Sequence, residues 1–162
     1  GKIVHGTPKD GKRLKREFLK KTPAIADLKA AITNALVAEE HHGKVTKWKR
    51  RYLKGLDSRP LQVRSLHSAL NLLLQSAGAL ICKKWIVLLE ENLLALGLDH
   101  GADFQYMAWV HDEVQVACRT KEIAETVVKV AQDSMRQAQD FFGFRVQLDT
   151  EGKIGKTWCD CH

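Results

Sequence analysis

The longest regular feature of the sequence is an apolar stretch between Ser65 and Gly97. Its apolar side chains recur at the spacing of one face of an α-helix, and they are Leu66, Ala69, Leu70, Leu73, Ala77, Leu80, Ile81 and Leu88. Ser65 can cap the start of such a helix, and Gly97 supplies a stop. No other feature constrains the fold as strongly, and it predicts one long helix that is largely buried.

Polar side chains interrupt this stretch, so it holds no run of about 18 uninterrupted apolar residues that would predict a membrane-spanning helix. The interrupting residues are Asn71, Gln75, Lys83, Lys84, Glu90 and Glu91. The basic start, Gly1 to Lys21, lacks the apolar core and cleavage site of a secretory signal. With 162 residues, 44% of them hydrophobic, the chain can bury a core. We expect a soluble, cytoplasmic protein without a membrane partner.

The rest of the sequence alternates between helical and β-type patterns. We expect a first helix from Pro23 to about Glu40, which His41-His42-Gly43 ends, and then a basic hairpin over 45–64 with its turn at 55–60. After the long helix we expect a hairpin over 104–118, a helix after Thr120 and a strand over 144–148. The sequence contains no internal repeat. This order predicts an α+β fold, with a small antiparallel sheet and long helices.

The net charge of +7 is unevenly distributed along the chain. Residues 1–65 contain 17 Lys and Arg against 6 Asp and Glu, whereas residues 66–162 contain 9 against 13. The change of sign predicts a boundary near Ser65, which divides the chain into 1–64 and 65–162. A basic half beside an acidic half suits a polyanion held near a metal-binding centre, although basic charge often serves only solubility.

Four cysteines, at positions 82, 118, 159 and 161, lack the regular spacing of a disulfide framework. We expect them to be reduced thiols. Cys159, Cys161 and His162 offer three zinc-type ligands in a tight cluster. Because no second ligand pair stands at the spacing of a structural zinc site, we do not expect zinc.

Asp112 and Glu113 are adjacent carboxylates between two β-type runs, 104–110 and 114–118. The flanking runs place this charged pair at the bend of a hairpin. Carboxylate oxygens suit Mg²⁺, which needs only one or two of them when water and substrate phosphates supply its other ligands. For His111-Asp112-Glu113 taken alone, a solvated turn is the favoured alternative.

The surrounding sequence resembles family A DNA polymerases of the podovirus replicative type. Residues 106–116, YMAWVHDEVQV, closely resemble the motif C hairpin of that family. Three further segments resemble the family in the same order along the chain. Residues 48–57 and 63–65 resemble the hairpin that precedes the palm helix, and residues 70–82 resemble the long palm helix itself. Residues 148–153 and 161–162 resemble the carboxy terminus. The resemblance covers nearly the whole chain.

This resemblance implies that Asp112 binds the catalytic magnesium ions together with an aspartate of motif A. It makes Glu113 a nearby, less essential catalytic carboxylate. It also assigns Asn71, Gln75 and His111 to hydrogen bonds with the minor-groove edge of primer-template DNA. Asn71 and Gln75 fall on one helical face, and the alternative is that they satisfy backbone groups inside the core.

Lys49, Arg50 and Arg51 belong to the densest basic and aromatic cluster of the chain, which also contains Lys47, Trp48, Tyr52 and Lys54. Such a cluster suits DNA phosphates or a base stack. A hairpin whose basic face is only solvated explains the same residues equally well.

The sequence contains no Asp-x-Ser strand of motif A and no Arg-x-x-x-Lys-x-x-x-x-Tyr-Gly helix of motif B. We therefore expect a carboxy-terminal segment of a DNA-directed DNA polymerase, inactive alone, with the rear part of the fingers in 1–64 and the carboxy-terminal part of the palm in 65–162. Its implied partners are Mg²⁺, primer-template DNA, dNTPs, the amino-terminal polymerase portion and a processivity factor, in the cytoplasm of a phage-infected bacterium.

Two other functions stay open at this point. A non-catalytic nucleic-acid-binding domain would use the basic half for phosphates and the hairpin for protein contact. A self-contained metal nuclease built on Asp112 and Glu113 is disfavoured, because no other carboxylate cluster stands out as a partner site.

Overall fold

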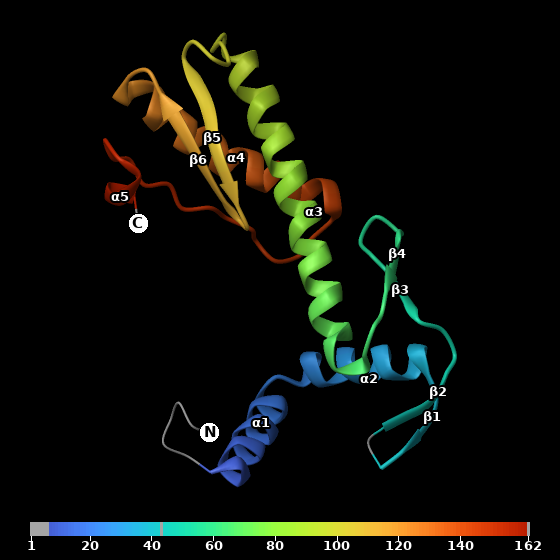
Figure 1. Ribbon diagram of the computed structural model, residues 1–162. Helices are drawn as coiled ribbons and strands as arrows, with labels where there is room; N and C mark the ends of the chain where they lie inside the picture. Colours follow the sequence, from blue (N-terminus) through green and yellow to red (C-terminus); the bar gives the residue numbers. More distant parts are fainter. Residues whose placement is uncertain (1–6, 43, 162) are drawn as a thin grey trace. The chain divides into compact units, whose positions relative to one another are not determined.

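The computed structural model describes residues 7–42 and 44–161. It confirms the α+β fold class, although its strands form three separate two-stranded antiparallel sheets and not one. The elements are α1 (Pro8–Lys21), α2 (Pro23–Leu36), β1 (Val37–His41), β2 (Lys44–Trp48), β3 (Tyr52–Lys54), β4 (Pro60–Gln62), α3 (Leu66–Ala95), β5 (Phe104–Val110), β6 (Glu113–Cys118), α4 (Lys121–Phe142) and α5 (Trp158–Cys161). Figure 1 shows this order by colour.

The chain divides into two compact units, Gly1–Gln75 and Ser76–His162. Helix α3 begins in the amino-terminal unit and ends in the carboxy-terminal unit. The division at residue 64 into parts of fingers and palm stays a prediction.

Helix α1 opens the described chain and was not expected from the sequence. Its start is a capping box, in which the backbone N–H of Thr7 donates to Asp10 Oδ2 at 2.9 Å and the N–H of Asp10 donates to Thr7 Oγ1 at 3.3 Å. Pro8 occupies the first turn, where its missing N–H costs nothing. The order Thr-Pro-x-Asp was the signal that could have predicted this helix.

The helix predicted to run to about Glu40 ends earlier, because α2 stops at Leu36 and strand β1 follows. Val37 pairs with Trp48 and His41 pairs with Lys44, so cross-strand pairing with β2 overrides the helical pattern. His42, with φ 50°, lies in the turn of this hairpin. His41-His42 therefore begins a hairpin turn and does not end a helix; Gly43 lies outside the described residues.

The basic hairpin predicted over 45–64 is split between two hairpins. Strand β2 pairs with β1, and β3 pairs with β4 around the predicted turn, where the N–H of Gly55 donates to the carbonyl of Arg59 at 2.9 Å. The core of the amino-terminal unit lies beneath these hairpins and is formed by Ile32, Leu36, Val37, Leu53, Val63 and Ala69, with Trp48 and Leu70 packed against it.

The long helix is confirmed as α3, and the Ser65 hydroxyl accepts from the N–H of Ser68 at 3.4 Å at its start. Gly97 follows its end with φ +80°, the left-handed conformation of a helix stop. The prediction that it is largely buried is wrong, since only 11% of its most apolar window is buried. Judged by length and composition alone, α3 is long and apolar enough to cross a membrane. The polar residues that interrupt it therefore do not exclude a membrane-spanning helix by that test.

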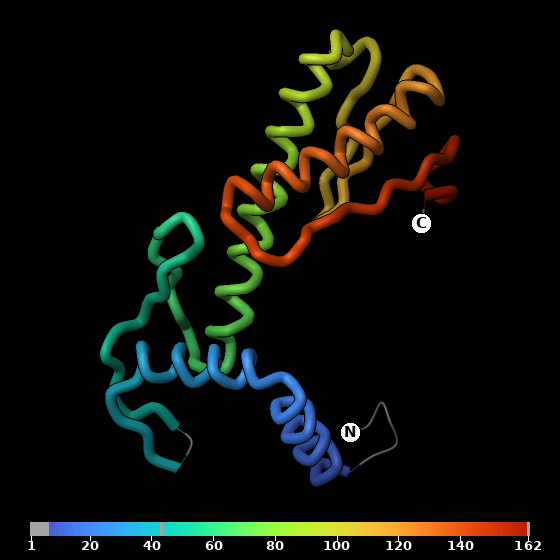
Figure 2. Tube along the Cα trace, turned by 180° about the vertical axis from the view of Figure 1, so that it is seen from behind, coloured from blue at the N-terminus to red at the C-terminus, as the bar shows by residue number. Residues whose placement is uncertain are grey.

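The carboxy-terminal unit packs the β5–β6 hairpin and α4 against the second part of α3. Two core clusters join them: Leu89, Leu93, Phe104 and Val127 in one, and Trp85, Met135 and Ala138 in the other. The Trp85 indole N–H donates to the carbonyl of Ala131 at 2.8 Å, which fixes α4 on α3. Seen from behind, α4 crosses the hairpin in Figure 2.

The ends of α4 agree with the sequence, but the strand expected after it does not form. Thr120 Oγ1 accepts from the N–H of Ile123 at 3.3 Å, as predicted for the cap of this helix. Residues 144–148 lack strand structure, because the N–H of Leu148 donates to Gln139 Oε1 at 2.7 Å and is not paired with a neighbouring strand. An extended tail leads from there to the short helix α5.

Candidate functional site

The β5–β6 hairpin turns tightly at His111 and Asp112. Val110 pairs with Glu113, so the bend holds two residues, and Glu113 belongs to β6 rather than to the expected three-residue bend. His111 has φ 56°, a left-handed conformation that tight hairpin turns require. The indole N–H of Trp109 donates to the carbonyl of His111 at 3.0 Å and braces the turn.

The two adjacent carboxylates of the hairpin lie in different surroundings. Asp112 is exposed, and no residue in the described part of the chain forms a hydrogen bond or ion pair with its carboxylate. Glu113 is half-buried, and the Gln115 amide donates a hydrogen bond to its Oε1. Asp112 is therefore the carboxylate of the pair that the fold leaves available for a ligand.

Asp112 and Glu113 line a cavity of about 1260 Å³ in the carboxy-terminal unit. Its other walls come from α3, β6, α4 and the tail 149–158. Burial, and secondarily the negative charge of Asp112, raise the pKa of the Cys82 thiol on α3. The carboxylate thus acts electrostatically on α3 across the cavity. Sequence reasoning placed only the terminal His162, which lies outside the described residues, near the catalytic centre, and gave neither Cys82 nor residues 149–158 a place at the site.

The donor atoms at the hairpin fit magnesium better than zinc. Asp112 and Glu113 supply hard carboxylate oxygens, and Mg²⁺ completes its shell with water and phosphates when the protein offers few ligands. Within residues 7–42 and 44–161, no three His, Cys, Asp or Glu side chains are arranged to hold a metal together. The Cys161 thiol instead donates to the carbonyl of Lys153 at 3.7 Å, and His162 lies outside the described residues.

The three predicted phosphate-binding residues of the amino-terminal unit are exposed, and each also contacts its own unit. Lys49 Nζ donates to the carbonyl of Asn34 at 2.9 Å. The guanidinium of Arg50 lies 5.5 Å from the ring centre of Tyr52, and that of Arg51 lies 4.9 Å from the ring centre of Trp48. Arg51 also donates to the carbonyl of Arg64 at 3.2 Å.

Asn71 and Gln75 lie one helical turn apart on α3, and both are exposed. Neither side chain is used to satisfy a backbone group in the described chain, contrary to the alternative of two amides inside the core. The structure thus groups His111 with Asp112 and Glu113 in one unit, and Asn71 with Gln75 in the other.

One protein-family model covers nearly the whole chain, including both of these groups of residues. The model of DNA polymerase family A matches residues 2–160. The chain therefore belongs to DNA polymerase family A.

Two relatives from bacteriophages match the whole chain. The chain is 55% identical to the DNA-directed DNA polymerase of Enterobacteria phage T3 and 54% identical to that of Escherichia phage T7, in each case across 100% of its length. It spans 24% of the length of each of these two proteins. DNA polymerase I of Aquifex aeolicus is 30% identical over 62% of the chain and 17% of its own length.

Proposed function

We propose that this chain is a carboxy-terminal part of a DNA-directed DNA polymerase and supplies one of the aspartates of its metal site. The observation that carries the proposal is the exposed carboxylate of Asp112, which has no partner in the described chain and lines a cavity at the tip of a braced hairpin. The family match and the relatives of phages T3 and T7 support the same activity.

In the proposed reaction, Asp112 would hold magnesium, and Glu113 is a second, more constrained carboxylate. Two magnesium ions, when bound, activate the primer 3′-hydroxyl and stabilise the leaving pyrophosphate. The protein's own contribution is positional: the tight turn and the Trp109 hydrogen bond fix the Asp112 backbone before substrate arrives. The motif A aspartate that the family resemblance implies is not among these 162 residues, so we propose that they do not catalyse alone.

The remaining predicted residues are proposed to hold primer-template DNA. The exposed amides of Asn71 and Gln75, together with His111, can donate to the N3 and O2 acceptors that the minor groove presents in every sequence. Lys49, Arg50 and Arg51 would then contact phosphates, which fix position without reading bases. Their contacts within their own unit orient them but also reduce how far they can reach.

The proposed partners are dNTPs, the amino-terminal portion of the polymerase and a processivity factor. The proposed location is the cytoplasm of a bacterial host, because the relatives of phages T3 and T7 are phage DNA polymerases.

The test replaces each carboxylate in a full-length polymerase that contains this chain. Asp112→Asn keeps the shape of the side chain but removes a charged metal ligand, so we expect kcat for primer extension to fall by at least about a thousandfold. Glu113→Gln should cost about tenfold or less, because Glu113 is less exposed than Asp112 and is already hydrogen-bonded by Gln115. Equal tolerance of both substitutions, with DNA binding unchanged, would reduce the hairpin to a structural role.

A further inference from the structure

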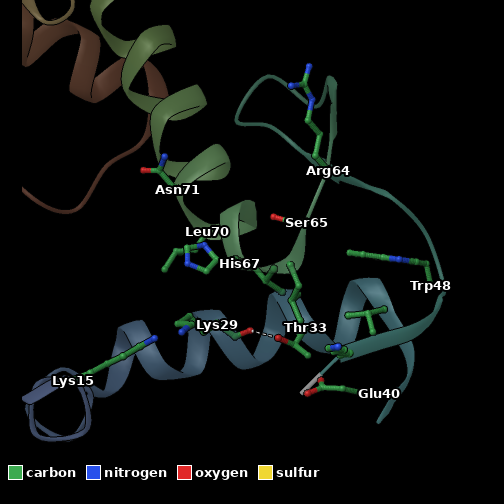
Figure 3. A pocket seen from close by; sticks show the side chains of 14 residues that line it. Lys15, Lys29, Thr33, Glu40, Trp48, Arg64, Ser65, His67, Leu70 and Asn71 are labelled. Atoms are coloured by element: carbon green, nitrogen blue, oxygen red, sulfur yellow. Dashed lines mark hydrogen bonds between the residues drawn. The ribbon is translucent and has the colours of Figure 1, made fainter. Parts of the chain in front are cut away.

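The amino-terminal unit contains a second cavity, of about 760 Å³, which Figure 3 shows from close by. The residues that line it include four cations, Lys15, Lys29, Lys44 and Arg64, and one carboxylate, Glu40. A concave surface lined mainly by one sign of charge attracts ions of the opposite sign, so this cavity disfavours metal cations. The cavity beside the β5–β6 hairpin is lined by the adjacent carboxylates of Asp112 and Glu113, and a metal cation is therefore expected there.

Glu113 and Gln115 are neighbours on one face of β6. Successive side chains of a strand point to opposite faces, and Val114 and Val116 pack against the two core clusters of the carboxy-terminal unit. Glu113 and Gln115 therefore lie on the face that points away from this core, and both are half-buried there. Because they are two residues apart on the same face, their side chains can contact each other.

One hydrogen bond joins the two side chains. The Gln115 amide donates to Glu113 Oε1, and so occupies a lone pair that a metal ion would otherwise use. The carboxylate of Asp112 is exposed and accepts no hydrogen bond within the described part of the chain. The two adjacent carboxylates therefore differ in how freely they can bind a cation, and Gln115 contributes to the difference.

The number of free carboxylates influences which cation a site prefers. Mg²⁺ keeps several waters and needs one or two carboxylates, whereas Ca²⁺ takes six to eight oxygen ligands and often uses carboxylates bidentately. Mn²⁺ also accepts carboxylate oxygens readily. A hairpin that presents one carboxylate suits Mg²⁺, and a hairpin that presents two favours cations with more oxygen ligands.

We propose that Gln115 is a positioning residue that holds Glu113 back from the metal, so that the hairpin presents Asp112 alone. The inference rests on the proposed polymerase function, because it concerns the same metal site. Replacement of the Gln115 amide by an apolar side chain of similar size should release Glu113 as a second carboxylate ligand.

The binding test measures the Mn²⁺ affinity of the 162-residue chain from the electron paramagnetic resonance signal of free Mn²⁺. Gln115→Leu should lower the dissociation constant by about tenfold, which is the scale of changes around metal ligands. Gln105→Leu is the matched control, because Gln105 is exposed on β5 of the same hairpin and does not line the cavity. It should change the constant by less than about twofold.

A double-mutant cycle shows whether Glu113 is the group that is released. In a Glu113→Gln background, Gln115→Leu should change the Mn²⁺ dissociation constant by less than about twofold, because the carboxylate that it would release is gone. Circular dichroism checks that each variant folds. Unchanged or weaker binding in Gln115→Leu alone, or tighter binding that persists in the Glu113→Gln background, would overturn the proposal.

An activity arm uses the full-length polymerase that contains this chain. Gln115→Leu should lower the Ca²⁺ concentration that halves primer extension in Mg²⁺ by about tenfold, because a second carboxylate favours Ca²⁺. Gln105→Leu should leave it unchanged, and an unchanged value in Gln115→Leu would contradict the proposal. The Mn²⁺ measurement requires no synthesis, so its failure would leave the proposal for Asp112 standing. Failure of the Asp112 proposal would show separately, as Mn²⁺ binding that Asp112→Asn does not weaken.

Discussion

At the scale of single residues, the hairpin strand β5 carries a hydroxyl that the fold leaves unsatisfied. The Tyr106 hydroxyl and Glu90 Oε2 are buried, and neither makes a hydrogen bond of normal geometry within the described residues, although Glu90 lies close enough to raise the pKa of Tyr106. The other oxygen of Glu90 lies 2.9 Å from His100 Nδ1, and the His100 and Tyr106 rings form a T-shaped pair with 5.4 Å between their centres. A buried, unpaired hydroxyl costs about 1–3 kcal/mol of stability.

Tyr106→Phe should therefore stabilise the chain, by about 1 kcal/mol, because it removes the unpaired hydroxyl and keeps the ring packing. Urea denaturation measures the change. Tyr52→Phe is the matched control, since Tyr52 is exposed, and it should change the free energy of unfolding by less than about 0.5 kcal/mol. A loss of stability in Tyr106→Phe would mean that the hydroxyl has a strong partner.

The Tyr106 hydroxyl should also make the free energy of unfolding depend on pH in one direction. Burial, and then the negative charge of Glu90, raise the pKa of Tyr106 far above its usual range. The fold thus favours the neutral phenol, so this contribution to stability is complete below about pH 10 and declines as the pH rises from there. Above about pH 10, the free energy of unfolding of Tyr106→Phe should fall less steeply with pH than that of the parent chain. Parallel curves for the two proteins would contradict the assignment.

Single residues of the hairpin turn were predictable because their position depends on local sequence. His111 and Asp112 occupy the bend that the flanking β-type runs define. Cys82 faces the Asp112 charge from a helix distant in the sequence, and no pattern in either segment records that proximity. Contacts of this kind arise from packing, so the place of Cys82 in the cavity wall was missed.

At the scale of elements, the left-handed end of α4 gives a direct test of local conformation. Gly143 has φ +67°, and the N–H groups of Gly143 and Phe144 donate to the carbonyls of Asp140 and Gln139, each at 3.1 Å. A Cβ at Gly143 would meet nothing within 4 Å, so its cost is purely conformational. Gly143→Ala should lower the free energy of unfolding by about 1 kcal/mol.

Gly78 supplies the control for this substitution. It lies inside α3, and a Cβ there also meets nothing within 4 Å. Gly78→Ala should therefore raise the free energy of unfolding by roughly 0.5–1 kcal/mol, because alanine loses less backbone entropy in a helix. Urea denaturation of both variants should give opposite signs, and equal signs would contradict the assigned conformations.

Elements with local start and stop signals were predicted well, and elements that depend on pairing were not. Thr120 and Gly97 mark the start of α4 and the end of α3 as their residue types predict. The sequence pattern predicts helix where β1 lies, because only pairing with β2 makes this segment a strand. Residues 144–148 have strand composition but pair with no strand of the described chain, and composition alone cannot supply a partner.

At the scale of the whole molecule, the chain leaves apolar surface uncovered next to its candidate metal ligand. Met107, Trp109 and Val110 on β5 are 64%, 43% and 46% exposed. Side chains of this kind on a strand invite cover by another segment of protein. Together with the 24% of relative length that the chain spans, this surface supports an active site completed by residues outside the chain.

The central claim is that Asp112 is one part of a two-metal site that the amino-terminal polymerase portion completes. The most direct measurement is primer extension in Mg²⁺ by the purified 162-residue chain, alone and mixed with a separately produced amino-terminal portion that carries motifs A and B. We predict no extension by the chain alone, templated extension by the mixture, and none when the mixed chain carries Asp112→Asn. Templated extension by the chain alone, or by the Asp112→Asn mixture at the parent rate, would contradict the claim.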